Sequence, residues 1–174
     1  SSAFLDCKDL VSIIIPNSVT NIGDCAFGGC TSLTNVYYNG TIEDWCNISF
    51  SSSSSNPMCY ASHFYMLDEN NEYKEVTEIV IPETVTKIGD YKFYGFGNIT
   101  NITIPNSVIS IGKSAFGGCT SLTSMTLPFI GNGGSETHFG YIFGATYKSV
   151  NYGYVPTTLK EVTITGYKGI GNFA

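Results

Sequence analysis

Two histidines, His63 and His138, are the side chains of this sequence best suited to acid–base chemistry near neutral pH. A nucleophilic site built on histidine also needs a serine or cysteine within hydrogen-bond reach and a third group that orients the ring. Neither histidine is accompanied by the G-x-S-x-G turn that presents a nucleophilic serine in many hydrolases. We therefore expect both histidines to be structural or solvent-exposed, and we assign no catalytic residue.

The run DENNE at residues 68–72 carries oxygen atoms that could bind Ca²⁺. A Ca²⁺ loop needs ligands at alternating positions and a central glycine, and this run has neither. It is better suited to a solvated hairpin turn. Glycoside hydrolysis would need two carboxylates facing each other across a cleft, whereas the 14 Asp and Glu residues are scattered over loops. The sequence therefore predicts no metal site and no cofactor.

The six cysteines do not form a disulfide pattern. Three of them occupy one position of a repeated unit, described below: Cys7, Cys30 and Cys119. Phe96 takes that position once, which indicates a buried apolar site, where free cysteine is common. A Cys46–Cys59 bridge remains an alternative if the chain is secreted. No C-x-x-C pair is present to suggest a metal.

The composition excludes two classes of function. The eight basic residues are spread singly and the net charge is −6, so no basic stripe is available to neutralise the phosphates of a nucleic acid. No apolar run reaches the roughly 18 residues of a membrane-spanning helix. The first residues also lack the basic region and apolar run of a signal peptide.

The elements that position these residues come from an internal repeat. Residues 13–34, IIIPNSVTNIGDCAFGGCTSLT, return at residues 102–123 with 17 of 22 positions identical, and a third copy covers residues 79–96. The unit is L-x-x-I-x-I-P-x-x-V-x-x-I-G-x-x-A-F-x-x-C, with a period of 23. One such unit cannot bury its apolar stripe alone, so the repeat predicts a solenoid of stacked coils.

Each unit is expected to begin with a short half-buried strand, because its apolar residues are spaced by two. Proline then ends the strand, since it cannot donate to the next ladder position. The glycine after the last isoleucine predicts a positive φ or a close backbone approach. The aromatic of A-F should fill the centre of each coil. The first apolar position is held by Leu10, Leu33, Val76, Ile99, Leu122 and Leu159, the glycine by Gly23, Gly89 and Gly112, and the aromatic by Phe27, Phe93 and Phe116.

We expect a single solenoid over residues 1–174. Its units are residues 10–32, 33–75, 76–98, 99–121 and 122–158, with partial units at 1–9 and 159–174. Because both ends fall inside a unit, we expect the chain to be a fragment of a longer array. In the second unit, Ile42, Trp45 and Phe50 should keep the V, I and F positions, and a hairpin should follow a Ser-rich loop.

Side chains that point outward from successive strands form the first candidate binding surface. Neighbouring strands lie about 4.8 Å apart, so these side chains make a grid roughly 25 Å wide. Solenoids commonly bind through such extended surfaces, although ordinary β-surface preference would also explain the residue types. The candidates are Ser12, Ile14, Asn35, Tyr37, Glu78, Val80, Asn101, Thr103, Ser124 and Thr126.

A Gly- and Tyr-rich insertion in the fifth unit, residues 131–156, is the second candidate. We expect a loop that protrudes from one face of the solenoid, where aromatic side chains could anchor a partner. The alternative is that its rings fold back to cover the solenoid. The candidate residues are Tyr141, Phe143, Tyr147, Tyr152 and Tyr154.

The unit with proline, glycine, phenylalanine and cysteine in register resembles the BspA-type leucine-rich repeat of bacterial surface proteins, over essentially the whole chain. Three positions depart from the pattern: Lys92 replaces alanine, Phe96 replaces cysteine and Asn39 replaces proline. The resemblance implies a mostly β, right-handed curved coil, with a parallel sheet on the concave face and turns or short helices on the convex face. It also implies a cell-surface or secreted location.

The resulting functional hypothesis is a non-catalytic adhesion or protein-binding module. It would recognise a protein ligand, such as a host matrix or cell-surface protein, through the concave sheet and the inserted loops. Two alternatives stay open. The solenoid could be a spacer that displays other domains, or it could bind or process glycans, since tyrosine rings stack well on sugars.

Overall fold

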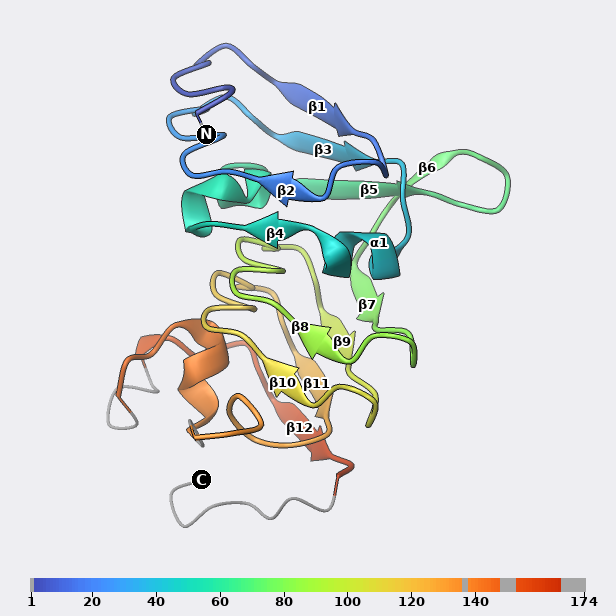
Figure 1. Cartoon of the computed structure of the whole chain (residues 1–174), viewed down its shortest axis with the longest axis vertical. Helices are drawn as coiled ribbons and strands as arrows, with labels where there is room; N and C mark the ends of the chain where they lie inside the picture. Colours follow the sequence, from blue (N-terminus) through green and yellow to red (C-terminus); the bar gives the residue numbers. More distant parts are fainter. Residues whose placement is uncertain (1, 136–137, 148–152, 167–174) are drawn as a thin grey trace.

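The computed structural model describes residues 2–135, 138–147 and 153–166. Its coils stack along one axis and contribute strands to two four-stranded sheets (Figure 1). The first sheet contains the parallel strands β1 (Ser12–Ile15), β3 (Asn35–Tyr38) and β5 (His63–Leu67), followed by the antiparallel β6 (Tyr73–Glu75). The second contains the parallel strands β7 (Glu78–Val80), β9 (Asn101–Thr103), β11 (Ser124–Leu127) and β12 (Glu161–Ile164).

The strand register follows the repeat. Ser12 pairs with Asn35, and Ile102 pairs with both Ile79 and Met125. Equivalent positions of successive units therefore lie side by side, and this confirms the expected leucine-rich-repeat solenoid. We call the solvent-facing side of the two four-stranded sheets the sheet face; it corresponds to the concave face of the sequence analysis.

A second row of very short strands lies along another side of the coils. β2 (Asn21–Ile22) pairs with β4 (Ser49–Phe50), and β8 (Lys87–Ile88) pairs with β10 (Ser110–Ile111). The helical elements are short: α1 (Ile42–Asn47) and the 3₁₀ helices η1 (Ser53–Ser55), η2 (Pro57–Cys59) and η3 (Phe139–Phe143). The described residues are thus mostly strand and turn.

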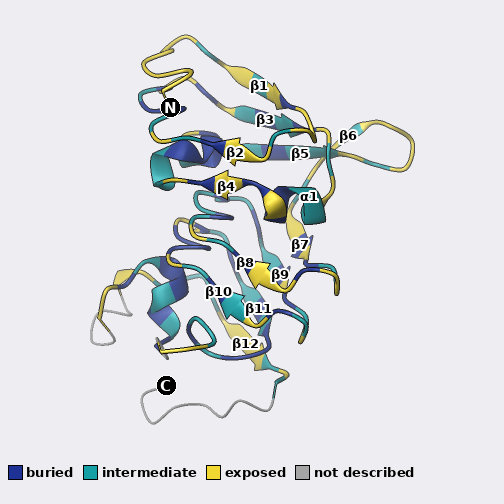
Figure 2. Cartoon of the chain, in the orientation of Figure 1, coloured by how far each residue is buried: buried dark blue, intermediate teal, exposed yellow. Residues whose placement is uncertain are grey.

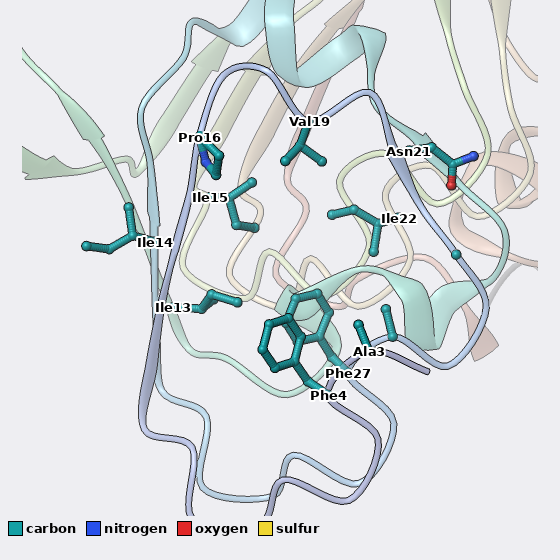
Figure 3. Close-up of a pocket in the computed structure, with 12 residues that line it drawn as sticks. Ala3, Phe4, Ile13, Ile14, Ile15, Pro16, Val19, Asn21, Ile22 and Phe27 are labelled. Atoms are coloured by element: carbon teal, nitrogen blue, oxygen red, sulfur yellow. The ribbon is translucent and has the colours of Figure 1, made fainter. Parts of the chain in front are cut away.

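The core runs through the centre of the coils. Figure 3 shows one coil in cross-section, with Ile13 and Ile15 pointing inward and Ile14 pointing away. The aromatic of A-F stacks on its equivalent in the next coil: the ring centroids of Phe4 and Phe27 lie 5.3 Å apart. In Figure 2 the turns of the first coil are exposed, because no described coil covers them.

The cysteine position of the repeat is buried where coils cover it on both sides. Cys30 and Cys119 are fully buried, and each thiol donates to a backbone carbonyl of the preceding coil. Cys7 is exposed, so the expectation of a buried site is wrong there, because it lies in the first coil. All six cysteines are free, and Cys46 and Cys59 form no bridge.

At Gly112 the glycine after the last isoleucine serves close approach and not a positive φ. A Cβ at Gly112 would lie 2.5 Å from the carbonyl carbon of Gly89 in the preceding coil and closer still to Asp90. The positive φ values occur instead at the glycine before the cysteine position, as at Gly95 (φ 80°) and Gly118 (φ 76°). The prediction of a positive φ or a close backbone approach is thus confirmed at Gly112, through close approach, and is wrong at Gly89, where neither is found.

We predict that Gly112→Ala lowers the free energy of unfolding by about 2 kcal/mol, because backbone atoms must move to admit the methyl group. Gly89 holds the same repeat position, but a Cβ there would meet only the Cε of Lys92, at 3.6 Å. Gly89→Ala is therefore the matched control, with a change below about 1 kcal/mol. Urea unfolding of both variants measures the difference. Equal losses would show that the close coil contact at Gly112 is not present.

The second unit departs from the expected pattern. Its helix α1 begins with a capping box in which the Thr41 side chain accepts from the Asp44 amide and the Asp44 carboxylate accepts from the Thr41 amide. Phe50 pairs in register with Ile22, so it holds the I position and the expected F position is wrong. The α1 turn inserts extra residues ahead of β4 and shifts the pattern.

The hairpin of β5 and β6 is confirmed, and its turn is the acidic run 68–72. The Asp68 carboxylate accepts from the amides of Asn70 and Glu72, and these bonds hold its pKa below the ordinary value. In addition, β5 pairs in parallel with β3, which the sequence analysis did not foresee. β5 is therefore a strand of the solenoid as well as one arm of the hairpin.

This hairpin interrupts the strand pairing between the coils that precede β7 and the coils that follow. We call the boundary between these two halves of the solenoid the seam. β6 occupies the edge of β5, so β5 does not pair with β7, and β4 does not pair with β8. Side chains connect the two halves instead. The Trp45 indole N–H donates to the carbonyl of Lys92 at 2.9 Å, and the buried Asn56 amide donates to the carbonyls of Tyr91 and Lys92.

Candidate binding face

The sheet face collects the side chains that alternate with the buried ones along each strand. Ile14 and Val80 are 60% and 64% exposed, although both are aliphatic. Equivalent residues lie in rows across the strands, because the register of every parallel pair is in step with the repeat. All ten sequence-selected positions are exposed or partly exposed: Ser12, Ile14, Asn35, Tyr37, Glu78, Val80, Asn101, Thr103, Ser124 and Thr126. Their part in binding remains a prediction.

Three tyrosines form an aromatic cluster on the first sheet. The rings of Tyr37 and Tyr65 stack with centroids 4.9 Å apart, and Tyr73 meets Tyr37 edge-on at 4.8 Å. All three side chains are partly exposed. The Tyr73 hydroxyl also donates to the Asn39 side chain, which ties the hairpin to the end of β3. Mutual stacking favours this arrangement of the three rings.

Hydrogen-bonded carboxylates continue the face across the seam. The Glu75 carboxylate lies 2.7 Å from the Nδ1 of His63 and accepts from the Asn98 amide at 3.0 Å. These two bonds lower the pKa of Glu75. One coil further on, the Asn101 amide donates to Glu78 at 2.9 Å. Both carboxylates are therefore oriented at the sheet surface, Glu75 by His63 of β5 and by Asn98 in the turn before β9, and Glu78 by Asn101 of β9.

Tyr65, Tyr73 and Glu75 are functional candidates that were not predicted from the sequence. Residues 64–76 were expected to form a separate hairpin, so the outward grid did not extend onto them. The available signal was the spacing of Phe64 and Met66, which matches that of the paired Val36 and Tyr38 in β3.

The insertion of the fifth unit folds back on the solenoid. The amide of Phe116 donates to the carbonyl of Ile142 at 2.8 Å, and Phe143 is only 3% exposed. The expected protruding loop is thus wrong for residues 138–145, where the alternative of rings folded back over the solenoid holds instead. Phe143 belongs to the core and not to a contact surface. Tyr147 and Tyr154 are 70% and 46% exposed and Tyr141 is partly exposed, while Tyr152 lies outside the described residues.

Both histidines have polar partners in the described part of the chain. The described residues contain no group of three His, Cys, Asp or Glu side chains placed to hold a metal ion. His63 pairs with Glu75, and His138 is buried with its Nε2 3.2 Å from the carbonyl oxygen of Ala145. No helix in the described part of the chain is long and apolar enough to cross a membrane.

Three cavities lie away from the tyrosine cluster. One of about 380 Å³ is the open end of the first coil, lined by Phe4, Ile15 and Phe27 among others (Figure 3). The other two, of about 390 and 410 Å³, lie along the seam beside Lys92 and Tyr94. None of the three is lined by Tyr37, Tyr65 or Glu75. These three cavities thus lie apart from the tyrosine cluster and Glu75.

Stacked coils with a regularly spaced sheet face define a repeat solenoid of the leucine-rich class. The profile of the BspA type leucine rich repeat region matches residues 1–70 and 67–161, and six copies are found. The chain belongs to this family. No curated protein matches the sequence.

Several solved structures of leucine-rich repeat proteins are similar to this chain. A leucine-rich repeat protein from Bacteroides ovatus is 23% identical over 94% of this chain, with a TM-score of 0.43. A leucine-rich repeat protein of T. pallidum is 21% identical over 96%, with a TM-score of 0.42. A leucine-rich cell surface protein from Faecalibacterium prausnitzii is 18% identical over 99%, with a TM-score of 0.36. The chain spans 33%, 62% and 64% of these three proteins.

Proposed function

We propose that this chain is a non-catalytic protein-binding or adhesion module, and that its sheet face recognises the partner. The observation that carries the proposal is the row of outward side chains on β1, β3, β5 and β6, continued on β7, β9, β11 and β12. A stack of coils fixes these side chains at regular spacing, so an extended partner can contact many of them at once. Exposed aliphatic residues such as Ile14 and Val80 lose water on contact and favour binding.

The composition of the face supports a protein partner. Tyr, Ser, Asn and Thr predominate at its outward positions, and tyrosine with small polar residues is the mixture that antibody paratopes use for proteins. We further propose that the module acts at the bacterial cell surface or after secretion, as its repeat family implies. The partner class that we propose is a host matrix protein or a host cell-surface protein. The exposed Tyr147 and Tyr154 lie in the insertion and would modify specificity.

The test is binding of immobilised chain to a panel of matrix proteins and to a glycan array. We expect Tyr37→Ala combined with Thr103→Glu to weaken the strongest protein interaction by about tenfold or more, because the change reaches both sheets. The control is Thr86→Ala combined with Ile109→Ala, since both residues are exposed and neither belongs to the sheet face. Binding that survives the first pair but not the second would overturn the sheet face as the site. Binding to glycans alone would overturn the protein partner.

A further inference from the structure

We propose that the centre of the sheet face, at the seam, takes a basic extended segment of a partner protein. Lysine or arginine side chains of that segment would meet the Glu75 and Glu78 carboxylates beside the tyrosine cluster. This inference rests on the proposed function and names the chemistry of its partner.

The sign of the charge on the face is the first support. In the two four-stranded sheets as described, the charged outward side chains are the glutamates Glu75, Glu78 and Glu161, and none is a lysine. Lys74 belongs to β6 but pairs with Met66, so it lies on the opposite side of the hairpin. A face with carboxylates and no lysine favours a positively charged partner, both in the rate of encounter and in specificity.

Hydrogen bonds orient the Glu75 and Glu78 carboxylates at the surface, which is the second support. The described hydrogen bonds to Glu75 converge on its Oε1, from His63 and Asn98, and the bond to Glu78 also reaches Oε1. The second oxygen of each group can therefore accept from an incoming cation. Charge-assisted hydrogen bonds of this kind are roughly twice as strong as neutral ones. Since the amides hold the carboxylates in place, little side-chain freedom remains to be lost on binding.

The tyrosine cluster supplies contact area beside these charges. Tyr65 pairs with Glu75 across the hairpin, and its ring stacks on Tyr37. Aromatic rings next to carboxylates suit the long apolar stem and the cationic end of lysine or arginine. The outward side chains are exposed or partly exposed and lie in rows across the paired strands. This arrangement favours a chain segment over a small molecule, because small-molecule sites are concave and enclose most of the ligand.

The test uses a phage library of random dodecapeptides, selected on the wild-type chain. We expect the selected peptides to be enriched in lysine and arginine. The charge variant Glu75→Gln/Glu78→Gln should bind them about tenfold more weakly. The control Glu69→Gln/Glu83→Gln removes the same number of charges from exposed positions elsewhere, and should change the affinity by less than about twofold. Circular dichroism melting of each variant establishes that the fold is retained.

The outcomes separate this inference from the proposed function. Peptides without an excess of basic residues, but sensitive to Tyr37→Ala/Thr103→Glu, would overturn the basic partner and leave the sheet face as a protein site. Equal losses of peptide affinity in the two charge variants would overturn the basic partner as well, because such losses would reflect the net charge of the chain and not the two carboxylates at the seam. If no peptide depends on the sheet face, both the inference and the proposed function fail.

Discussion

Replacing Lys92 by alanine is expected to lower the free energy of unfolding by about 3 kcal/mol, although alanine is the residue that the repeat prefers there. Ala26 and Ala115 hold this position in other coils. Consensus reasoning would therefore predict a gain in stability. The structure predicts a loss of stability, because Lys92 lies at the seam whereas Ala26 and Ala115 do not.

The reason lies in what the lysine contacts. Its side chain is only 2% exposed, and its ammonium donates to the carbonyls of Trp45, at 3.2 Å, and of Ile48 at the end of α1. It also lies 5.1 Å from the centre of the Phe50 ring. The lysine thus satisfies carbonyls at a helix C-terminus and fills the space that a paired coil fills elsewhere. Alanine would leave a cavity and remove both hydrogen bonds.

The burial of Lys92 also makes the free energy of unfolding depend on pH. Burial lowers the pKa of Lys92 from 10.5 to about 8. Between these pH values the unfolded chain binds more protons than the folded chain, so this residue makes stability rise with pH, by about 3 kcal/mol in total. The buried Cys46 and Cys119 act in the opposite direction above pH 9, since burial raises both pKa values to about 12.

The measurement is therefore the difference between the chain with Lys92 and the Lys92→Met chain, followed by urea unfolding from pH 7 to 10.5. Methionine keeps the stem and removes the charge. Cys119 cancels in the comparison, and both chains carry Cys46→Ala because the charge of Lys92 acts on the pKa of Cys46. We expect the chain with Lys92 to gain stability relative to the Lys92→Met chain as the pH rises through this range. Parallel pH profiles would show that Lys92 is not buried as a charged group.

Among core substitutions, replacing the phenylalanine of the A-F pair by alanine should cause the largest loss in the free energy of unfolding. Phe116 is fully buried, and its ring stacks on Phe93 with centroids 5.7 Å apart and an interplanar angle of 4°. We expect Phe116→Ala to lower the free energy of unfolding by about 4 kcal/mol, through lost burial and the cavity that remains. Ile109→Ala, at a position 64% exposed, should change it by less than about 0.5 kcal/mol.

A double-mutant cycle with Phe93→Ala tests whether adjacent coils share one core. Direct stacking predicts a coupling energy of about 1 kcal/mol between the two positions. Because each variant is strongly destabilised, the cycle is measured in a stabilising osmolyte at fixed concentration. Additive losses would contradict the contact between coils.

The regular coils were predictable because each repeats the same contacts. The row formed by Ile79, Ile102 and Met125 follows from apolar spacing alone, and adjacent copies support one another. The seam was not predictable in the same way. β5 lacks the leucine, isoleucine and proline of the unit, so its place in the sheet depends on pairing with β3, which is a tertiary contact.

The candidate face was predicted in part for the same reason. Strand alternation placed Tyr37 and Thr103 outward, and the structure agrees. The spacing of Phe64 and Met66 was an available signal for Tyr65. The contact of Tyr73 with Tyr37 depends on the hairpin register and could not follow from the repeat. Likewise, the burial of Phe143 depends on the fold-back of an aperiodic insertion, for which sequence spacing carries no signal.

Hydrogen–deuterium exchange of the chain with and without a bound partner tests the account most directly. The partner is either a selected peptide or the matrix protein that the panel identifies. If the sheet face binds, amide protection should increase in residues 35–39, 63–67 and 73–80, and the insertion around residues 138–147 should change little. Protection confined to that insertion, or to the turns on the other sides of the coils, would contradict it.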